Sequence, residues 1–233
     1  MISFIIPAYN EEQLLGRTLI TLNAAARMLD EPFEVVVVDD ASTDRTAAIA
    51  REQGARVVSV NHRQIAATRN AGAREAQGDI LFFVDADTQA NARAIRAGLR
   101  AIQQGAVGGG CVCRYDGWIP LWARILLLMG DAGGRLLKLV GGAFLFCRRS
   151  DFEAIGGFCE RYYAAEEVVF VKALKRRGLF VIPWETVVTS NRKLCTMSLR
   201  RVLGPLFRLA VGGPESFHSR EGLDLWYGPE ARD

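Results

Sequence analysis

Short apolar runs alternate with longer amphipathic stretches over the first 105 residues, which is the pattern of a parallel sheet covered by helices. The apolar runs predict strands at residues 2–6, 33–38, 56–60 and 80–84. Helical spacing of the apolar positions predicts helices at residues 11–29, 43–53, 64–76 and 91–103. We expect Pro7 to end the first strand and Ser42 to cap the second helix. The pattern predicts an α/β fold, Rossmann-like, with a mostly parallel central sheet and helices on both faces.

The pattern after residue 105 is less regular. It predicts a strand near residues 106–115, an apolar helix near 121–139, a strand at 143–147, a helix at 166–177, and short strands near 179–182 and 186–189. A basic amphipathic stretch follows from Ser198 to Val211. Because neither an internal repeat nor a linker rich in proline, glycine or serine separates the halves, we expect a single domain over residues 1–233.

Composition narrows the class of protein. The chain has 233 residues and half of them are hydrophobic, so it can bury a substantial core. A net charge of +3 is too small and too dispersed for a nucleic-acid binder, so we expect no nucleic-acid partner. The five cysteines include no C-x-x-C pair, which favours reduced thiols in the cytoplasm over a zinc or redox site.

The apolar stretches also bear on location. The amino terminus has neither the cationic start nor the long apolar run of a secretory signal, so we expect none. The longest apolar stretch, residues 118–130, is interrupted by Pro120 and Arg124. It is shorter than the ~20 apolar residues that span a bilayer. We therefore expect a protein that is cytoplasmic or lies at the inner face of the membrane.

Unusual polar residues follow three of the predicted strands. The first strand ends in Pro7-Ala8-Tyr9-Asn10-Glu11, the second in Asp39-Asp40, and the fourth in Asp85-Ala86-Asp87. Ligands of an open parallel sheet bind in the crevice outside the carboxyl ends of its strands. Two acids with one residue between them can hold a hard divalent ion and a sugar hydroxyl. The alternative is a turn with solvated acids, because aspartate is common after strands.

These segments belong to a larger set of motifs in register, and the set comprises residues 5–12, 36–44, 67–73, 78–79, 83–88, 141–144, 148–149, 156–158, 165–167 and 174–178. Together the motifs resemble the inverting nucleotide-sugar glycosyltransferases of family two, which have the GT-A fold. The resemblance covers roughly residues 1–190. It implies a nucleotide-sugar-binding half over residues 1–105 and an acceptor and catalytic half over 106–190. The pattern of the remaining residues, 191–233, predicts a basic amphipathic carboxyl-terminal segment.

The resemblance also implies roles for the residues that match its motifs. It places the nucleotide sugar against these residues: Pro7, Ala8, Tyr9, Glu11, Asp39, Arg69, Asp85, Ala86 and Asp87. It implies that Asp87, helped by Asp85, holds Mn²⁺ or Mg²⁺. Such an ion neutralises the charge that develops on a nucleoside diphosphate leaving group. For Arg69 the alternative is an arginine on a helix surface.

Inversion at the anomeric carbon needs one displacement, in which a carboxylate takes the proton of the acceptor hydroxyl. The resemblance places Glu167 at the position of this base, with Glu166 as the other candidate. Glutamate replaces the aspartate that is commoner in the family, so the reach to the acceptor must differ. The structural alternative is a pair of glutamates in the first turn of a helix, where the helix dipole favours them.

Two departures from the family pattern refine the expected function. A histidine found in many relatives is absent near Arg192, so metal binding rests on Asp87 and the diphosphate. The Q-x-x-R-W signature of processive synthases is also absent, which favours transfer of a single sugar. The expected reaction moves one sugar from a nucleotide-diphosphate sugar, with a UDP-sugar favoured, to a hydroxyl acceptor.

The apolar stretch of residues 118–129 and the basic stretch of 198–211 support the hypothesis of a lipid-linked or membrane-near acceptor. For the basic stretch, the alternative is a helix packed on the domain. Two other functions remain open at this point. One is a nucleotide-sugar-binding module without catalytic activity. The other, ranked lower, is a haloacid-dehalogenase-type phosphatase, because Asp85-Ala86-Asp87-Thr88 spells its D-x-D-x-T motif.

Overall fold

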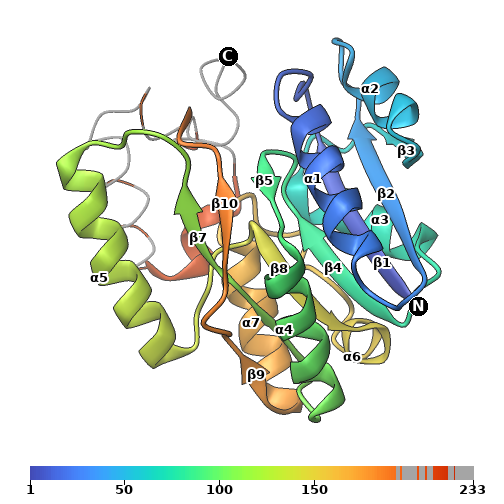
Figure 1. Cartoon of the computed structure of the whole chain (residues 1–233). Coiled ribbons are helices and arrows are strands. Elements are labelled where there is room, and N and C mark those ends of the chain that lie inside the picture. Colours follow the sequence, from blue (N-terminus) through green and yellow to red (C-terminus); the bar gives the residue numbers. More distant parts are fainter. Residues whose placement is uncertain (193–194, 196–203, 205–207, 209–211, 220–222, 224–233) are drawn as a thin grey trace.

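Seven strands form the central sheet of the computed structural model, which describes residues 1–192, 195, 204, 208, 212–219 and 223 (Figure 1). Their order is β3-β2-β1-β4-β8-β6-β9. The strands are β1 (Ile2–Ala8), β2 (Phe33–Asp40), β3 (Arg56–Val60), β4 (Ile80–Val84), β6 (Gly108–Gly110), β8 (Phe144–Arg148) and β9 (Phe180–Val181). Strand β8 is antiparallel to β4 and β6, and the other pairings in the sheet are parallel. The carboxyl ends of β1, β2 and β4 therefore meet at one edge.

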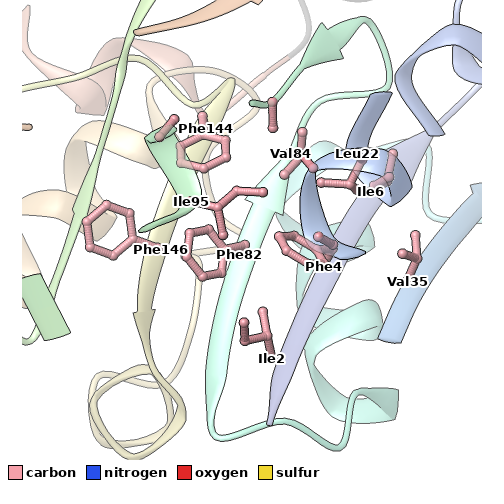
Figure 2. Close-up of a cluster of buried hydrophobic side chains, with 14 of the residues drawn as sticks. Ile2, Phe4, Ile6, Leu22, Val35, Phe82, Val84, Ile95, Phe144 and Phe146 are labelled. Carbon is pink, nitrogen blue, oxygen red and sulfur yellow. The ribbon is translucent and has the colours of Figure 1, made fainter. Parts of the chain in front are cut away.

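Helices cover both faces of the sheet, as the sequence predicts. One face is packed by α1 (Leu15–Arg27), α4 (Ala92–Gln103) and Ala50 of α2 (Thr46–Glu52). The other face is packed by α3 (Ile65–Glu75), α6 (Arg149–Ala154) and α7 (Glu166–Arg177). Figure 2 shows the first of these cores, where Phe146, Phe82 and Phe4 lie in a row across the sheet and Ile95 of α4 lies beside Phe82. The expected mostly parallel α/β fold is confirmed.

Two details of the first half differ from the prediction. Pro7 does not end β1, which continues to Ala8. At Pro7 the strand pairs with Val38 of β2, while its pairing with β4 stops at Ile5, so the missing amide of proline costs little there. Ser42 does not cap α2, which begins at Thr46. Its hydroxyl instead accepts a hydrogen bond from the amide of Asn10.

The single strand predicted near residues 106–115 is two strands in two sheets. After β6 the chain enters β7 (Val112–Tyr115), which joins β5 (Thr88–Gln89) and β10 (Thr186–Thr189) in a three-stranded sheet of order β5-β10-β7. Glycines allow the close packing of β6, because a Cβ on Gly109 would overlap the carbonyl oxygen of Val181. The hydrophobic pattern did not predict the two-residue strand β5 or the helix α6.

Helix α5 (Leu121–Leu137) lies at the outer edge of the molecule in Figure 1, beyond β7 and β10. It ends two residues before the predicted position, where Lys138 adopts a left-handed backbone conformation. Within the part of the chain that the structure describes, no helix combines the length and the hydropathy needed to cross a bilayer. The predicted basic stretch of residues 198–211 lies outside the described residues, apart from 204 and 208.

Asp40, the last residue of β2, fastens the loop that leads into α3. Its buried carboxylate accepts hydrogen bonds from the amides of His62 (2.7 Å), Arg63 (2.9 Å) and Gln64 (3.2 Å), and from the hydroxyl of Thr68 (2.8 Å). A buried carboxylate with several donors is a strong local restraint. The sequence predicted the end of a strand at Asp39-Asp40, but it did not predict that Asp40 holds the following loop.

Asp40→Ala removes four hydrogen bonds at once, among them those to the buried amide of Gln64 and the buried hydroxyl of Thr68. We expect it to lower the free energy of unfolding by about 3 kcal/mol, measured by urea denaturation. Asp39→Ala is the matched control, because within the described residues the Asp39 carboxylate accepts one hydrogen bond, from the amide of Ser42, and we expect a loss of about 1 kcal/mol. Equal stabilities of the two variants would contradict this role of Asp40.

Candidate active site

The segment after β4 places Asp85 and Asp87 at the carboxyl edge of the sheet. The carboxylate of Asp87 accepts hydrogen bonds from the hydroxyls of Thr88 (3.3 Å) and Thr189 (3.2 Å). Its backbone carbonyl accepts a bond from the amide of Ser190 (3.2 Å). The Asp85 amide donates to the carbonyl of Ala143 (3.1 Å). These bonds hold both aspartates between the central sheet and β10.

Arg69 is the centre of the site, and its side chain is only 1% exposed. From α3 its Nη2 reaches the Asp85 carboxylate at 2.8 Å, and its Nη1 reaches the Glu166 carboxylate at 2.8 Å. Nη2 also donates to the carbonyl of Gly142 at 3.1 Å. A Cβ at position 142 would lie 2.9 Å from Nη2, so a larger residue there would displace the guanidinium. One buried cation thus joins the D-x-D segment to the start of α7.

The carboxyl groups of Glu166 and Glu167 share a buried environment at the first turn of α7. Burial, with the nearby charge of Glu167, raises the pKa of Glu166 from 4.5 to about 8, while Arg69 acts in the opposite direction. Burial also raises the pKa of Glu167, and Arg69 again opposes the shift. Glu166 is buried, whereas Glu167 is only partly buried. The pair therefore holds a proton at a higher pH than ordinary carboxyl groups do.

The residues expected to hold the nucleotide lie at the ends of β1 and β2. Pro7 and Ala8 are the last residues of β1, and Asp39 is buried near the end of β2. The guanidinium of Arg63 lies 3.4 Å from the centre of the Tyr9 ring, which is a cation–π contact. Arg63 lies in the loop that Asp40 holds by hydrogen bonds, and it is not among the site residues predicted from the sequence.

Glu11 forms an ion pair that the sequence could not show. Its two carboxylate oxygens lie 2.9 and 3.0 Å from Nη2 of Arg192, 181 positions away along the chain. Both side chains are mostly buried. The contact connects the loop after β1 to the end of β10, so Arg192 lies beside the expected nucleotide loop. The position of Arg192 in the sequence, shortly after Thr189 and before a lysine, does not indicate that it pairs with Glu11.

The structure brings most of the expected site residues to one edge of the sheet. Asp85, Arg69 and Glu166 form one ion-paired network, and Glu167 interacts electrostatically with both Arg69 and Asp85. Ala86 is buried between the two aspartates. Thr189 and the Gly142 carbonyl could not be predicted as members of the site, because they come from chain segments far from the D-x-D motif.

The donor set at this edge fits a hard divalent cation. Asp85 and Asp87 offer carboxylate oxygens, which Mg²⁺ and Mn²⁺ prefer, and these ions often take further ligands from substrate phosphates. Within the described residues, no group of three or more His, Cys, Asp and Glu side chains is arranged as a metal site. Burial and the charges of both aspartates raise the pKa of the nearby Cys113 thiol. The residues fit an ion that shares its coordination with a diphosphate.

This fold and this edge of acids define an α/β enzyme of the GT-A type. The sequence profile described as Glycosyl transferase family 2 matches residues 3–156, and the chain belongs to this family of glycosyltransferases. The position of Asp85 also argues against the phosphatase alternative, because it follows β4 rather than the first core strand and is ion-paired to Arg69.

Solved structures of glycosyltransferases share the fold. The mannosyltransferase PcManGT from Pyrobaculum calidifontis, in complex with GDP-Man and Mn²⁺, aligns with a TM-score of 0.63 and 20% identity over 99% of this chain and 72% of its own. TarS from S. aureus, in complex with UDP-GlcNAc, aligns with a TM-score of 0.64 and 21% identity over 89% of this chain and 64% of its own. Glucosyl-3-phosphoglycerate synthase from Mycobacterium tuberculosis, in complex with Mn²⁺ and UDP, aligns with a TM-score of 0.59 over 91% of this chain and 78% of its own, at 20% identity.

Curated relatives are more similar in sequence but longer. The undecaprenyl-phosphate 4-deoxy-4-formamido-L-arabinose transferase of Serratia proteamaculans is 31% identical over 172 residues, which is 69% of this chain and 52% of the relative. The protein of the same name from Pseudomonas paraeruginosa is 42% identical over 97 residues, 38% of this chain and 28% of the relative. This chain therefore spans about half or less of the length of these relatives.

Replacing Arg69 tests the network that it holds. Arg69→Met leaves the buried Glu166 without its cation, so we expect the free energy of unfolding to fall by about 4 kcal/mol in urea denaturation. Arg56→Met is the matched control, because Arg56 forms surface ion pairs with Glu34 and Glu75, and we expect a change within about 1 kcal/mol. An Arg69→Met protein as stable as wild type would show that the buried pairs contribute nothing.

Proposed function

We propose that this chain is an inverting glycosyltransferase that moves one sugar from a nucleotide-diphosphate sugar to the hydroxyl of an acceptor. A UDP-sugar is the favoured donor, and the acceptor is lipid-linked. The observation that carries the proposal is the single buried Arg69, which holds the donor-side Asp85 and the catalytic-side Glu166 at 2.8 Å each. The residues proposed to bind the donor and those proposed to activate the acceptor thus belong to one network of buried ion pairs.

The donor nucleotide occupies the crevice at the ends of β1, β2 and β4. We assign the base and ribose to Pro7, Ala8, Tyr9 and Asp39, which line the ends of the first two strands. The stacked Arg63 gives the Tyr9 ring a fixed orientation. Glu11 belongs to the same loop, and its partner Arg192 brings a positive charge to the place where the diphosphate lies.

The leaving diphosphate requires charge neutralisation at the D-x-D segment. Asp87, helped by Asp85 and with Ala86 between them, would hold Mn²⁺ or Mg²⁺, which supplies positive charge to the leaving group. The hydroxyls of Thr88 and Thr189 orient the Asp87 carboxylate by hydrogen bonds. PcManGT and glucosyl-3-phosphoglycerate synthase were both solved with Mn²⁺, which supports a divalent ion here.

Glu167 is the base that takes the proton from the acceptor hydroxyl as its oxygen attacks the sugar. The choice between the two glutamates follows from their contacts, because Glu166 is buried and its carboxylate is engaged by Arg69. Glu167 is the more accessible of the two, and its raised pKa makes it a stronger proton acceptor than an ordinary carboxylate. Glu166 then serves to position its neighbour.

Arg69 acts on the donor through Asp85. Its guanidinium is buried under the D-x-D segment and holds three oxygen atoms, from Asp85, Glu166 and Gly142. The sequence alone indicated a direct contact with the nucleotide. We assign it instead the fixing of Asp85 and the partial neutralisation of the glutamate pair.

A lipid-linked acceptor is supported by the names of the sequence relatives, which are undecaprenyl-phosphate sugar transferases. Such an acceptor implies that the protein works at the cytoplasmic face of a membrane. The relatives are about twice as long as this chain or longer, so the acceptor is assigned here by analogy and by the exposed apolar surface described below.

Two substitutions separate donor binding from transfer. Glu167→Gln keeps the shape of the side chain but cannot take a proton, so we expect nucleotide binding to persist and sugar transfer to fall at least ~100-fold. Asp87→Ala is expected to abolish the part of nucleotide binding that depends on Mn²⁺. Binding is measured as the rise in melting temperature on adding UDP with or without Mn²⁺. Transfer is measured as acceptor-dependent release of UDP.

The matched control is Glu153→Gln, an exposed glutamate on α6, which should leave both readings unchanged. Transfer by Glu167→Gln at the wild-type rate would refute the assignment of the base. Loss of transfer in Glu166→Gln with full activity of Glu167→Gln would move the role to Glu166.

The glutamate pair also predicts the pH dependence of transfer. A protonated base cannot accept the acceptor proton, and burial raises the pKa of Glu167, so its protonation occurs at a higher pH than that of an ordinary carboxyl group. We therefore expect kcat/KM to fall as the pH is lowered, with a midpoint above the ordinary carboxyl pKa of 4.5. Nucleotide binding measured across the same range should stay constant. A midpoint at the ordinary pKa of a carboxyl group would contradict the proposed environment of the pair.

A further inference from the structure

Helix α5 and the turn before it carry an unusual group of exposed apolar side chains. Ten large apolar side chains are exposed in the described part of the chain, and five of them lie between positions 118 and 129. Each of the five is more than half exposed, and they are Trp118, Leu121, Ile125, Leu128 and Met129. We call this set the α5 surface. Figure 1 shows α5 at the edge of the molecule, on the side away from α1 and α2.

The apolar side chains of the α5 surface lie along one face of the helix. Leu121, Ile125 and Leu128 follow one another at spacings of four and three, which places them in a single stripe along the helix. Ala123, which points to the other side, is only 1% exposed. The helix therefore has a buried side of its own and presents a second, apolar side to the solvent.

Positive charge borders this stripe. Arg124 and Arg135 are eleven positions apart, three helical turns, so both lie along the same flank. Arg124 is exposed. The helix contains one acid, Asp131, whose carboxylate is paired with Arg114 at 3.6 Å. The flank as a whole is cationic.

A small cavity continues the basic flank beyond the end of α5. Its volume is about 320 Å³, and its walls include Arg135, Lys138 and Trp184 over an apolar floor from residues 179–182. The Arg135 guanidinium lies 4.5 Å from the centre of the Trp184 ring, and Trp184 is 83% exposed. No acid lines this cavity among the described residues. An exposed tryptophan beside two cations fits the headgroup region of an anionic bilayer.

We propose that the α5 surface docks on a lipid bilayer that contains anionic lipids. The apolar stripe enters the boundary between headgroups and acyl chains, and Arg124, Arg135 and Lys138 meet lipid phosphates. A second copy of this chain is a poorer occupant, because two such surfaces face to face would bring their cationic flanks together without exposed acids on α5 to pair with them.

The docking surface is connected to the active site through the small sheet. The hydroxyl of Thr189 donates to the Asp87 carboxylate, and the carbonyl of Thr189 accepts the amide of Asp116, five residues before α5 begins. The strand that supports Asp87 is therefore hydrogen-bonded to the segment that leads into α5. This consequence rests on the proposed function, because it matters only if the acceptor is lipid-linked.

Sedimentation with vesicles tests the inference on the full chain. We expect wild-type protein at low salt to bind vesicles of phosphatidylcholine with phosphatidylglycerol, and to bind phosphatidylcholine alone much more weakly. The double variant Ile125→Glu/Leu128→Glu removes two apolar anchors and should bind the anionic vesicles at least about tenfold more weakly. Arg124→Gln should weaken binding to the anionic vesicles and not to the neutral ones.

The matched control is Ile20→Glu/Met28→Glu, which makes the same change of charge at two exposed apolar positions at α1 and its carboxyl-terminal end, and should bind like wild type. Circular dichroism and melting temperature establish that each variant is folded. Three results would overturn the inference: no binding of wild type to anionic vesicles, equal binding by the α5 double variant, or a dimer that the α5 double variant dissociates without any effect on vesicle binding.

Hydrolysis of UDP-sugar in buffer without vesicles separates this inference from the proposed function. The α5 variants should hydrolyse the donor at the wild-type rate, because the surface lies outside the site. Donor hydrolysis without vesicle binding would refute the docking surface alone. Vesicle binding that the α5 double variant abolishes, in a wild type without donor hydrolysis or transfer, would support the surface and contradict the proposed function.

Discussion

The buried guanidinium of Arg69 is the interaction on which the rest of the site depends. A charge removed from water is costly unless ionised partners and hydrogen bonds surround it, and Arg69 has Asp85, Glu166 and the Gly142 carbonyl. These partners come from three separate parts of the chain. Their positions are therefore not independent, because displacing any one leaves a buried charge without compensation.

Helix α3 also holds the segment that precedes α7. Next to Arg69, the side chain of Asn70 bonds both the amide and the carbonyl of Phe158, each at 2.9 Å. Gln64, at the start of the same helix, donates to the carbonyls of Glu160 (2.6 Å) and Tyr162 (3.3 Å). Asp40 holds the loop before α3. The glutamate pair is thus positioned by a helix that is anchored to the carboxyl edge of the central sheet, where the donor is proposed to bind.

Much of this organisation could be predicted from the sequence, because it is encoded locally. The continuous apolar run of β2 and the amphipathic spacing of α4 indicate a covered parallel sheet, and the helix over Glu166–Arg177 was predicted at the bounds that the structure has. The acids at the ends of β1, β2 and β4 mark the edge where the site lies. Such signals depend on residues that are neighbours in the chain.

The features that escaped prediction depend on residues that are far apart. The ion pair between Glu11 and Arg192 joins positions 181 apart, and the residues next to either one in the sequence do not indicate the pairing. The partners of the buried Arg69 include Gly142 and Glu166, which are distant in the sequence. The residues next to Arg69 in its helix therefore do not distinguish a buried arginine from one on a solvent-exposed helix surface. The division of residues 106–115 between two sheets follows from the close approach of Gly109 to β9.

A crystal structure of the chain with UDP-sugar and Mn²⁺ tests the central claim most directly. The account predicts a nucleotide over the carboxyl ends of β1, β2 and β4, with Arg69 still bound to Asp85 and Glu166, and with Glu167 as the carboxylate nearest the anomeric carbon on the acceptor side. A structure in which Arg69 leaves both carboxylates to bind the diphosphate, or in which the donor lies away from this edge, would contradict it.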